Sequence, residues 1–331
     1  MYTELSLWPA LICVVAGLGL LAWSANVFVD SAGRIATALG VNPFIVGMVI
    51  IGFGTSAPEL CVSALSGLSG HSDVSLGNAY GSCIFNIAAI LGVSTLIRPI
   101  VVKPSVTFVA VPALVGISLF SCLLVGGKGG FTRLDGFWHL GLFAVLLPLY
   151  CWFDQRSNPK EESAAPKTGE CLTWRCWGAL VAGLLILIGS SHVLVWGAVN
   201  VARSFGVSEL MIGLTIIAVG TSLPELASAI VSARKGEDEF VLGNIIGSNF
   251  FNTLAVVGLA GFITPFQHIS QYILCRDLPV MVLLSCSIAV FGVNPRRVRE
   301  NGVVNRLEGV LWILAFIVYL GVMMSQEMKG A

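Results

Sequence analysis

Long apolar runs, separated by short polar segments, dominate the chain. A membrane-spanning helix needs about 20 mostly apolar residues, and the pattern predicts ten such spans. They cover residues 7–29, 43–70, 74–97, 104–126, 136–153, 176–200, 209–235, 239–264, 278–294 and 309–325. The sequence therefore predicts an all-α, polytopic membrane protein.

The longest polar segment, residues 154–175, falls between the fifth and sixth spans. Its Pro, Asn and charged residues are typical of a solvated linker. We therefore expect two membrane units, residues 1–153 and 176–331, joined by a cytoplasmic linker.

The two units repeat one another. With a shift of 166 residues, Val14–Ile100 aligns with Leu180–Phe266 without a gap, and 34 of 87 positions are identical. Because shared membrane composition would align only apolar residues, the matched Pro, Glu, Asn, Thr and Ser indicate duplication. Five spans are an odd number, so the second unit must sit inverted in the membrane. Inverted repeats are common in secondary transporters, which bind their substrate near the midplane between the repeats.

Composition agrees with a membrane protein and excludes other classes. The chain is 56% hydrophobic and 11% charged, whereas soluble domains carry roughly 25% charged residues. Its 18 Lys and Arg balance 18 Asp and Glu, which leaves no basic face for nucleic acid. No pattern indicates a protein partner. Of the 18 basic residues, 13 fall in alternate loops that include the linker, so both termini are predicted outside the cell's inner or plasma membrane.

Two charged residues stand deep inside long apolar spans, Glu59 and Glu225, and they are equivalent under the 166-residue shift. An ionisable residue at membrane depth costs at least about 2.5 kcal/mol and marks a functional site by default. Pro58 and Pro224 precede them, remove a backbone donor each, and should kink or break the helix. Broken helices in a membrane are tolerated where they line a polar cavity.

Oxygen-bearing side chains surround the two glutamates at helical spacing. Those three and four residues before each glutamate share its helix face, and the next span of each repeat adds a Ser and an Asn four residues apart. The prolines should also free a backbone carbonyl in each half. The predicted cation ligands are Glu59, Glu225, Asn86, Asn252, Thr55, Ser56, Thr221, Ser222, Ser82 and Ser248, with the carbonyls of Gly52 and Ala218.

An all-oxygen set of this kind suits hard cations. Calcium takes 6–8 oxygen ligands in a flexible cage, and soft metals would require thiolate or imidazole. The two carboxylates balance the charge of one divalent ion. Calcium and sodium are therefore expected as transported ions, with no resident cofactor and no enzymatic activity.

At these residues the chain resembles the sodium/calcium exchanger family of the cation/calcium antiporter superfamily. The doubled motif consists of Gly54–Glu59 with Gly77–Asn86, and of Gly220–Glu225 with Gly243–Asn252. The likeness to compact prokaryotic members implies ten helices, a midplane site among the second, third, seventh and eighth, and the ligand set named above. It also implies alternating access by sliding of the first and sixth helices. Many relatives have an acid at one of the positions of Asn86 and Asn252, and here Cys83 is the counterpart of Asn249.

The resulting hypothesis is sodium-for-calcium exchange across the cell membrane. A proton-coupled calcium or sodium antiporter of the same superfamily is the main alternative. A passive channel would not require a countersubstrate, and an intramembrane hydrolase using both carboxylates would have no use for the surrounding hydroxyls.

Overall fold

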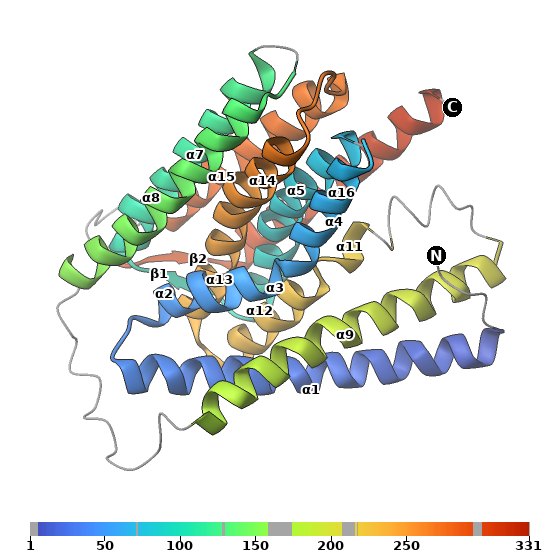
Figure 1. Ribbon diagram of the computed structural model, residues 1–331. Helices are drawn as coiled ribbons and strands as arrows, with labels where there is room; N and C mark the ends of the chain where they lie inside the picture. Colours follow the sequence, from blue (N-terminus) through green and yellow to red (C-terminus); the bar gives the residue numbers. More distant parts are fainter. Residues whose placement is uncertain are drawn as a thin grey trace.

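The computed structural model describes residues 6–70, 72–127, 130–157, 174–206, 216, 218–293 and 300–330. Nearly all of them are helical, and several spans contain a π-helical turn, labelled η (Figure 1). The first half comprises α1 (Leu7–Leu39), α2 (Pro43–Val46), η1 (Gly47–Gly52), α3 (Phe53–Thr55), α4 (Ala57–Leu68), α5 (Ser72–Phe85), η2 (Asn86–Leu91), α6 (Gly92–Ile97), β1 (Ile100–Val102), η3 (Val106–Ala110), α7 (Val111–Gly126) and α8 (Arg133–Ser157). The second half comprises α9 (Trp174–Ser204), α11 (Ala218–Gly220), α12 (Leu223–Lys235), α13 (Asp238–Phe250), η5 (Phe251–Val256), α14 (Val257–Ile263), η6 (Ile273–Asp277), α15 (Leu278–Gly292), β2 (Gly302–Val304) and α16 (Arg306–Gly330).

The predicted spans are found as helices. Within the described residues, eight helices are long and apolar enough to cross a membrane, and a ninth span is formed by Pro43–Thr55 with Ala57–Leu68. The prediction for residues 209–235 falls partly on residues outside the described part of the chain; α11 and α12 account for its second portion. The multi-pass helical architecture is thus confirmed.

The first helix is longer than predicted, because α1 continues ten residues beyond the expected end at residue 29. It stops at Gly40, whose φ of 61° is a left-handed conformation that glycine adopts without steric cost. Asn42 then caps α2, its Oδ1 accepting a hydrogen bond from the Phe44 N–H at 2.9 Å, and Pro43 starts that helix.

α1 and α9 form a crossed pair along one edge of the molecule (Figure 1). Glycines allow the close approach: a Cβ on Gly17 would lie 2.9 Å from the Cα of Leu194, and one on Gly183 would lie 3.1 Å from the Phe28 N. The two contacts are related by the 166-residue shift, since Gly17 matches Gly183 and Phe28 matches Leu194. The duplication is therefore present in the packing as well as in the sequence.

The centre of the molecule is formed by the third and eighth spans. Of the most apolar window of each, 78% is buried for Asp73–Ile97 and 89% for Asp238–Ile263, against 11% for Arg306–Gln326. Gly243 and Gly247 let α13 approach the backbone of η1, where a Cβ on Gly247 would lie 2.6 Å from the Cα of Met48. Small residues four apart permit close helix approach. The second-half pair is used in this way, whereas a Cβ on the equivalent Gly77 or Gly81 would meet nothing within 4 Å.

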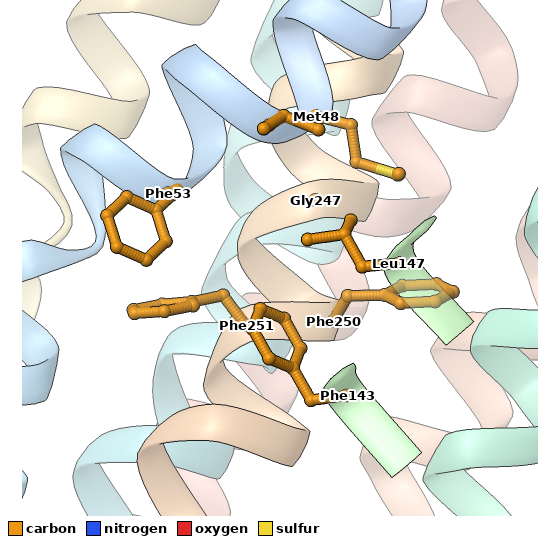
Figure 2. A pocket seen from close by; sticks show the side chains of 8 residues that line it. Met48, Phe53, Phe143, Leu147, Gly247, Phe250 and Phe251 are labelled. Carbon is orange, nitrogen blue, oxygen red and sulfur yellow. The ribbon is translucent and has the colours of Figure 1, made fainter. Parts of the chain in front are cut away.

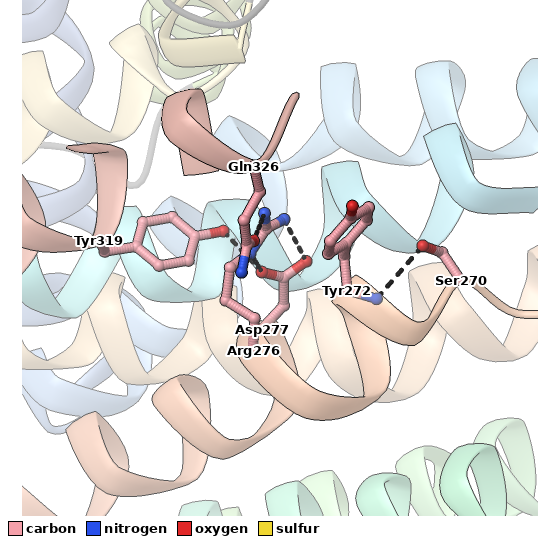
Figure 3. A network of polar contacts seen from close by, with 6 residues as sticks. All are labelled: Ser270, Tyr272, Arg276, Asp277, Tyr319 and Gln326. Carbon is pink, nitrogen blue, oxygen red and sulfur yellow. Dashed lines mark hydrogen bonds and ion pairs between the residues drawn. The ribbon is translucent and has the colours of Figure 1, made fainter. Parts of the chain in front are cut away.

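Two features of the fold were not predicted. A two-stranded antiparallel sheet pairs β1 with β2, which ties the loop after α6 to the loop before α16. At the start of α15, Arg276 forms an ion pair with Asp277 at 2.6 Å and donates a hydrogen bond to Gln326 of α16 (Figure 3). The Asp277 carboxylate also accepts from the hydroxyl of Tyr319, so these charges fasten α15 to α16.

Candidate cation site

Two helices begin in the interior of the molecule, each at a Ser-x-Pro-Glu-Leu sequence. α4 follows Ser56 and α12 follows Ser222, and each has proline in its first turn. The second span bends by 45° at this break, as the proline predicted. The glutamates lie in the first turns of α4 and α12, where the N-terminal end of the helix dipole favours negative charge.

The serines and glutamates are hydrogen-bonded across the repeats. Ser56 Oγ donates to Glu225 Oε1 at 2.9 Å, and Ser222 Oγ donates to Glu59 Oε1 at 2.8 Å. A Ser followed three residues later by Glu ordinarily forms a capping box within one helix, but neither serine caps its own helix here. The two breaks are therefore joined into one polar cluster with two-fold pseudosymmetry.

Each glutamate keeps one carboxylate oxygen free of protein partners. Glu59 and Glu225 are 0% and 1% exposed, and Oε2 of each is buried without a hydrogen bond. Among the described residues, no Lys or Arg forms an ion pair with either one. Because a buried unpaired charge is costly, the arrangement requires a cation or a proton from outside the chain.

Three other buried carboxylates are bonded to groups near the ends of helices and strands. Asp135 accepts from the backbone N–H and hydroxyl of Thr132, and Asp277 pairs with Arg276. Asp238 accepts from the Val101 N–H at 3.1 Å. Asp277 and Asp238 also have Arg276 and Arg98 within ion-pair distance, and among the described residues neither glutamate has such a partner.

Asn78 and Asn244 support the two glutamates, and the sequence analysis did not single them out. The Nδ2 of each donates to the backbone carbonyl of a glutamate: Asn78 to Glu59 at 3.1 Å and Asn244 to Glu225 at 3.2 Å. Their identity under the 166-residue shift was the available signal. They position the first turns of α4 and α12 against the neighbouring spans.

The predicted amides lie at matching places on the central spans. Asn86 begins η2, and Asn252 is the second residue of η5. Both are buried, with Asn86 1% and Asn252 0% exposed. Oδ1 of Asn86 and both polar side-chain atoms of Asn252 have no hydrogen-bond partner, so each residue has an oxygen available to a cation.

Some of the predicted hydroxyls bond within their own helix, and others lie in the polar cluster of the glutamates and serines. Ser82 Oγ lies 3.2 Å from Ser222 Oγ, whose hydrogen is directed to Glu59, so Ser82 belongs to the same cluster. Thr55 Oγ1 donates back to the carbonyl of Ile51 at 2.9 Å and keeps its lone pairs. Thr221 Oγ1 is buried without a hydrogen bond.

The expectation that proline frees the backbone carbonyl of Gly52 is wrong. The Gly52 carbonyl is not freed by the proline, because it accepts from the Ser56 N–H at 3.2 Å and from Ser248 Oγ at 3.1 Å. Proline removes the bond to the carbonyl four residues earlier, which for Pro58 is that of Gly54. Ser248 thus joins α13 to the end of η1. A role for the carbonyl of Ala218, the first residue of α11, stays a prediction.

A cavity of about 250 Å³ lies next to this cluster rather than in it. Figure 2 shows its lining, which includes Met48, Phe53, Phe143 and Phe251. No oxygen-bearing side chain lines the cavity, so it has nothing to offer a cation. Elsewhere, no three His, Cys, Asp or Glu side chains of the described segments gather to hold a metal ion, and the polar cluster is the candidate site.

A family model described as sodium/calcium exchanger protein matches residues 9–152 and 176–325. The chain belongs to the sodium/calcium exchanger family. This family is one of transporters, and its two matched stretches coincide with the two repeats.

Relatives of similar length support this assignment. The chain is 40% identical over 314 residues to CaxA of Alkalimonas amylolytica, covering 94% of this chain and 97% of that protein. It is 37% identical over 319 residues to the inner membrane protein YrbG of Escherichia coli, covering 94% and 95%. It is 28% identical over 350 residues to the sodium/calcium exchanger MaX1 of Methanosarcina acetivorans, covering 94% and 97%.

Solved structures show the same architecture. A structure of the sodium-calcium exchanger NCX_Mj soaked without Na⁺ and Ca²⁺ superposes with a TM-score of 0.80 at 27% identity, covering 95% of this chain and 98% of that one. A structure of the same exchanger soaked with 2.5 mM Na⁺ and 10 mM Sr²⁺ gives a TM-score of 0.81 at 27% identity, covering 96% and 99%. The exchanger fold thus extends over nearly the whole chain.

Proposed function

We propose that this exchanger moves calcium against sodium through one site shared by the two repeats. The observation that supports this most directly is the crossed pair of glutamates, each buried, bonded to the serine of the other repeat, and left with one unpartnered oxygen. Two carboxylates match the charge of one Ca²⁺ or of two Na⁺, so the two cations would compete for the same oxygens.

The ligands we assign are the oxygens that converge on this pair. Glu59 and Glu225 supply the charge, and Asn86 and Asn252 supply neutral oxygens. The hydroxyls of Thr55, Ser56, Ser82, Thr221, Ser222 and Ser248 complete the set or hold it in place. Calcium and sodium both accept carboxylate, amide and hydroxyl oxygens.

Orientation follows from the basic residues of the loops. With the linker and the ends of α1 and α12 in the cytoplasm, 13 of 18 Lys and Arg lie on the inner side. Both termini would then be outside. YrbG, a relative of similar length, is named an inner membrane protein, which agrees with residence in the cell membrane.

The exchange is tested with purified protein in sealed lipid vesicles. At clamped pH and voltage, an outward sodium gradient should drive uptake of ⁴⁵Ca²⁺, and removal of sodium from the lumen should stop it. Uptake that ignores sodium but follows a proton gradient would replace our proposal with proton coupling. Calcium entry with no countersubstrate would indicate a channel.

A further inference from the structure

The two amides of the site differ in how they are supported. Asn86 Nδ2 donates to Asn249 Oδ1 at 2.9 Å, and Asn249 Nδ2 donates to the backbone carbonyl of Cys83 at 3.3 Å. A carbonyl can only accept, so the Asn249 amide must turn its nitrogen toward Cys83 and its oxygen toward Asn86. The Asn86 amide must then use its nitrogen for Asn249, which leaves its oxygen free.

These two consecutive hydrogen bonds fix the orientation of the Asn86 side chain. All three side chains are at most 1% exposed, so water does not compete for these bonds. The oxygen left over, Asn86 Oδ1, has no protein partner. A buried carboxamide oxygen that cannot rotate away is a preorganised cation ligand.

Asn252 lacks the equivalent support, although it matches Asn86 under the 166-residue shift. The counterpart of Asn249 in the first half is Cys83, and the two face each other where the central spans meet. The Cys83 thiol lies 3.9 Å from the Asn249 carbonyl and 3.5 Å from Thr253 Oγ1. It makes no bond to Asn252, and both Nδ2 and Oδ1 of Asn252 are buried without partners.

We propose that Asn249 is a positioning residue that orients the Asn86 oxygen toward calcium. Asn252 lacks an equivalent positioning residue, because Cys83 stands where Asn249 stands in the other half. This inference rests on the proposed site. The two repeats then contribute unequally: Asn86 is the stronger amide ligand, and Asn252 must be oriented by the bound cation or by water. Outer residues that orient metal ligands typically contribute about 10–100-fold to metal affinity.

The test is equilibrium binding of ⁴⁵Ca²⁺ to the purified full chain in detergent. Asn86→Ala should weaken calcium binding at least about fivefold more than Asn252→Ala, because only the first removes a preorganised ligand. Asn249→Cys should weaken binding about tenfold with an unchanged number of sites. These three variants test the proposal by themselves, even if the swapped variant described next does not fold.

The swapped variant Cys83→Asn/Asn249→Cys separates positioning from simple packing. It moves the supporting amide to the first half, so binding should recover to within about threefold of wild type and Asn252→Ala should become the costlier change. Equal costs of Asn86→Ala and Asn252→Ala in the wild-type background would overturn the inference, as would wild-type affinity in Asn249→Cys. Absence of calcium binding by the wild-type chain would instead overturn the proposed function itself.

Discussion

At the scale of single residues, the site is built from a Ser-x-x-Glu motif whose hydrogen bonds cross between the repeats. A serine three residues before a glutamate would normally close a helix end. Here Ser56 and Ser222 bond the glutamates of the opposite repeat. The residue pattern predicted which side chains belong to the site, but the crossing follows from tertiary packing of the two breaks and could not be inferred from spacing.

Replacing either glutamate by glutamine should abolish sodium-driven calcium uptake or reduce it at least about 100-fold. Glu59→Gln and Glu225→Gln each leave one negative charge to balance a divalent ion in a buried cluster, where charge imbalance is costly. Glu237→Gln, in the loop between α12 and α13, is the matched control and should transport normally. Near-normal uptake in either site variant would contradict a shared site.

The crossed serines predict a smaller, symmetric loss. Ser56→Ala and Ser222→Ala each remove a hydrogen bond to a carboxylate, worth about 1.5–3 kcal/mol, so the apparent calcium affinity should fall about 10-fold or more. Ser228→Ala serves as the control, because Ser228 lies on the same helix as Glu225 and its buried hydroxyl has no hydrogen-bond partner. Affinities are read from initial uptake rates against calcium concentration. A loss confined to one of the two serines would argue against the pseudosymmetric arrangement.

At the scale of elements, the central spans are held by backbone contact. α13 lies against η1 through Gly243 and Gly247, and Ser248 bonds the Gly52 carbonyl at the same contact. The same glycine spacing occurs at Gly77 and Gly81 without a close approach, so spacing alone does not predict which pair is used. The π-helical turns and the short sheet had no recognisable signal, because neither depends on a distinctive hydrophobic period.

Gly247→Ala should therefore destabilise the protein. Its added methyl would collide with the backbone of Met48, and overpacking of this kind costs typically about 1–3 kcal/mol. Gly321→Ala in α16 has open space around the new methyl and gains helix propensity. Thermal unfolding of the two purified variants should show a lower Tm for the first only. An unchanged Tm for Gly247→Ala would mean that α13 and η1 are less closely packed than described.

Glu237, in the loop that joins α12 to α13, should make the stability of the protein depend on pH. Burial raises the pKa of Glu237, Asp30 raises it further, and Lys235 opposes both. Because the folded state then holds the proton more tightly than the unfolded state, this group favours folding at acid pH and the benefit is lost as pH rises through the folded pKa.

Glu237→Gln removes that titration. It should raise the Tm by a degree or two near pH 8, and the difference should vanish at about pH 3, well below the pKa of an unfolded Glu, where the wild-type carboxyl is protonated in both states. The comparison of one variant at two pH values is its own control. A stabilisation of equal size at both values would show that titration of Glu237 is not the cause.

At the scale of the whole molecule, the repeats match in sequence but not in environment. α1 packs along α12, where Lys235 pairs with Asp30 at 2.5 Å. α4, the counterpart of α12, is covered less: Leu65 is 64% and Leu68 62% exposed, although Ser63 on the same helix is buried. Within the described residues, the equivalent helices α4 and α12 are therefore buried to different extents.

The architecture was predictable because duplication and hydropathy act over hundreds of residues. A multi-pass helical fold, a duplication and a polar cluster shared by the two halves followed from patterns that no single substitution would hide. The unequal burial of α4 and α12 was not predictable, since sequences that are equivalent in both halves are compatible with either arrangement.

The central claim is that both repeats bind one calcium ion in competition with sodium. Equilibrium binding of ⁴⁵Ca²⁺ to the purified chain tests it most directly. We predict one calcium per chain, displaced by rising sodium and lost in both Glu59→Gln and Glu225→Gln. Calcium binding that persists at full affinity in either variant, or that sodium does not displace, would contradict the account.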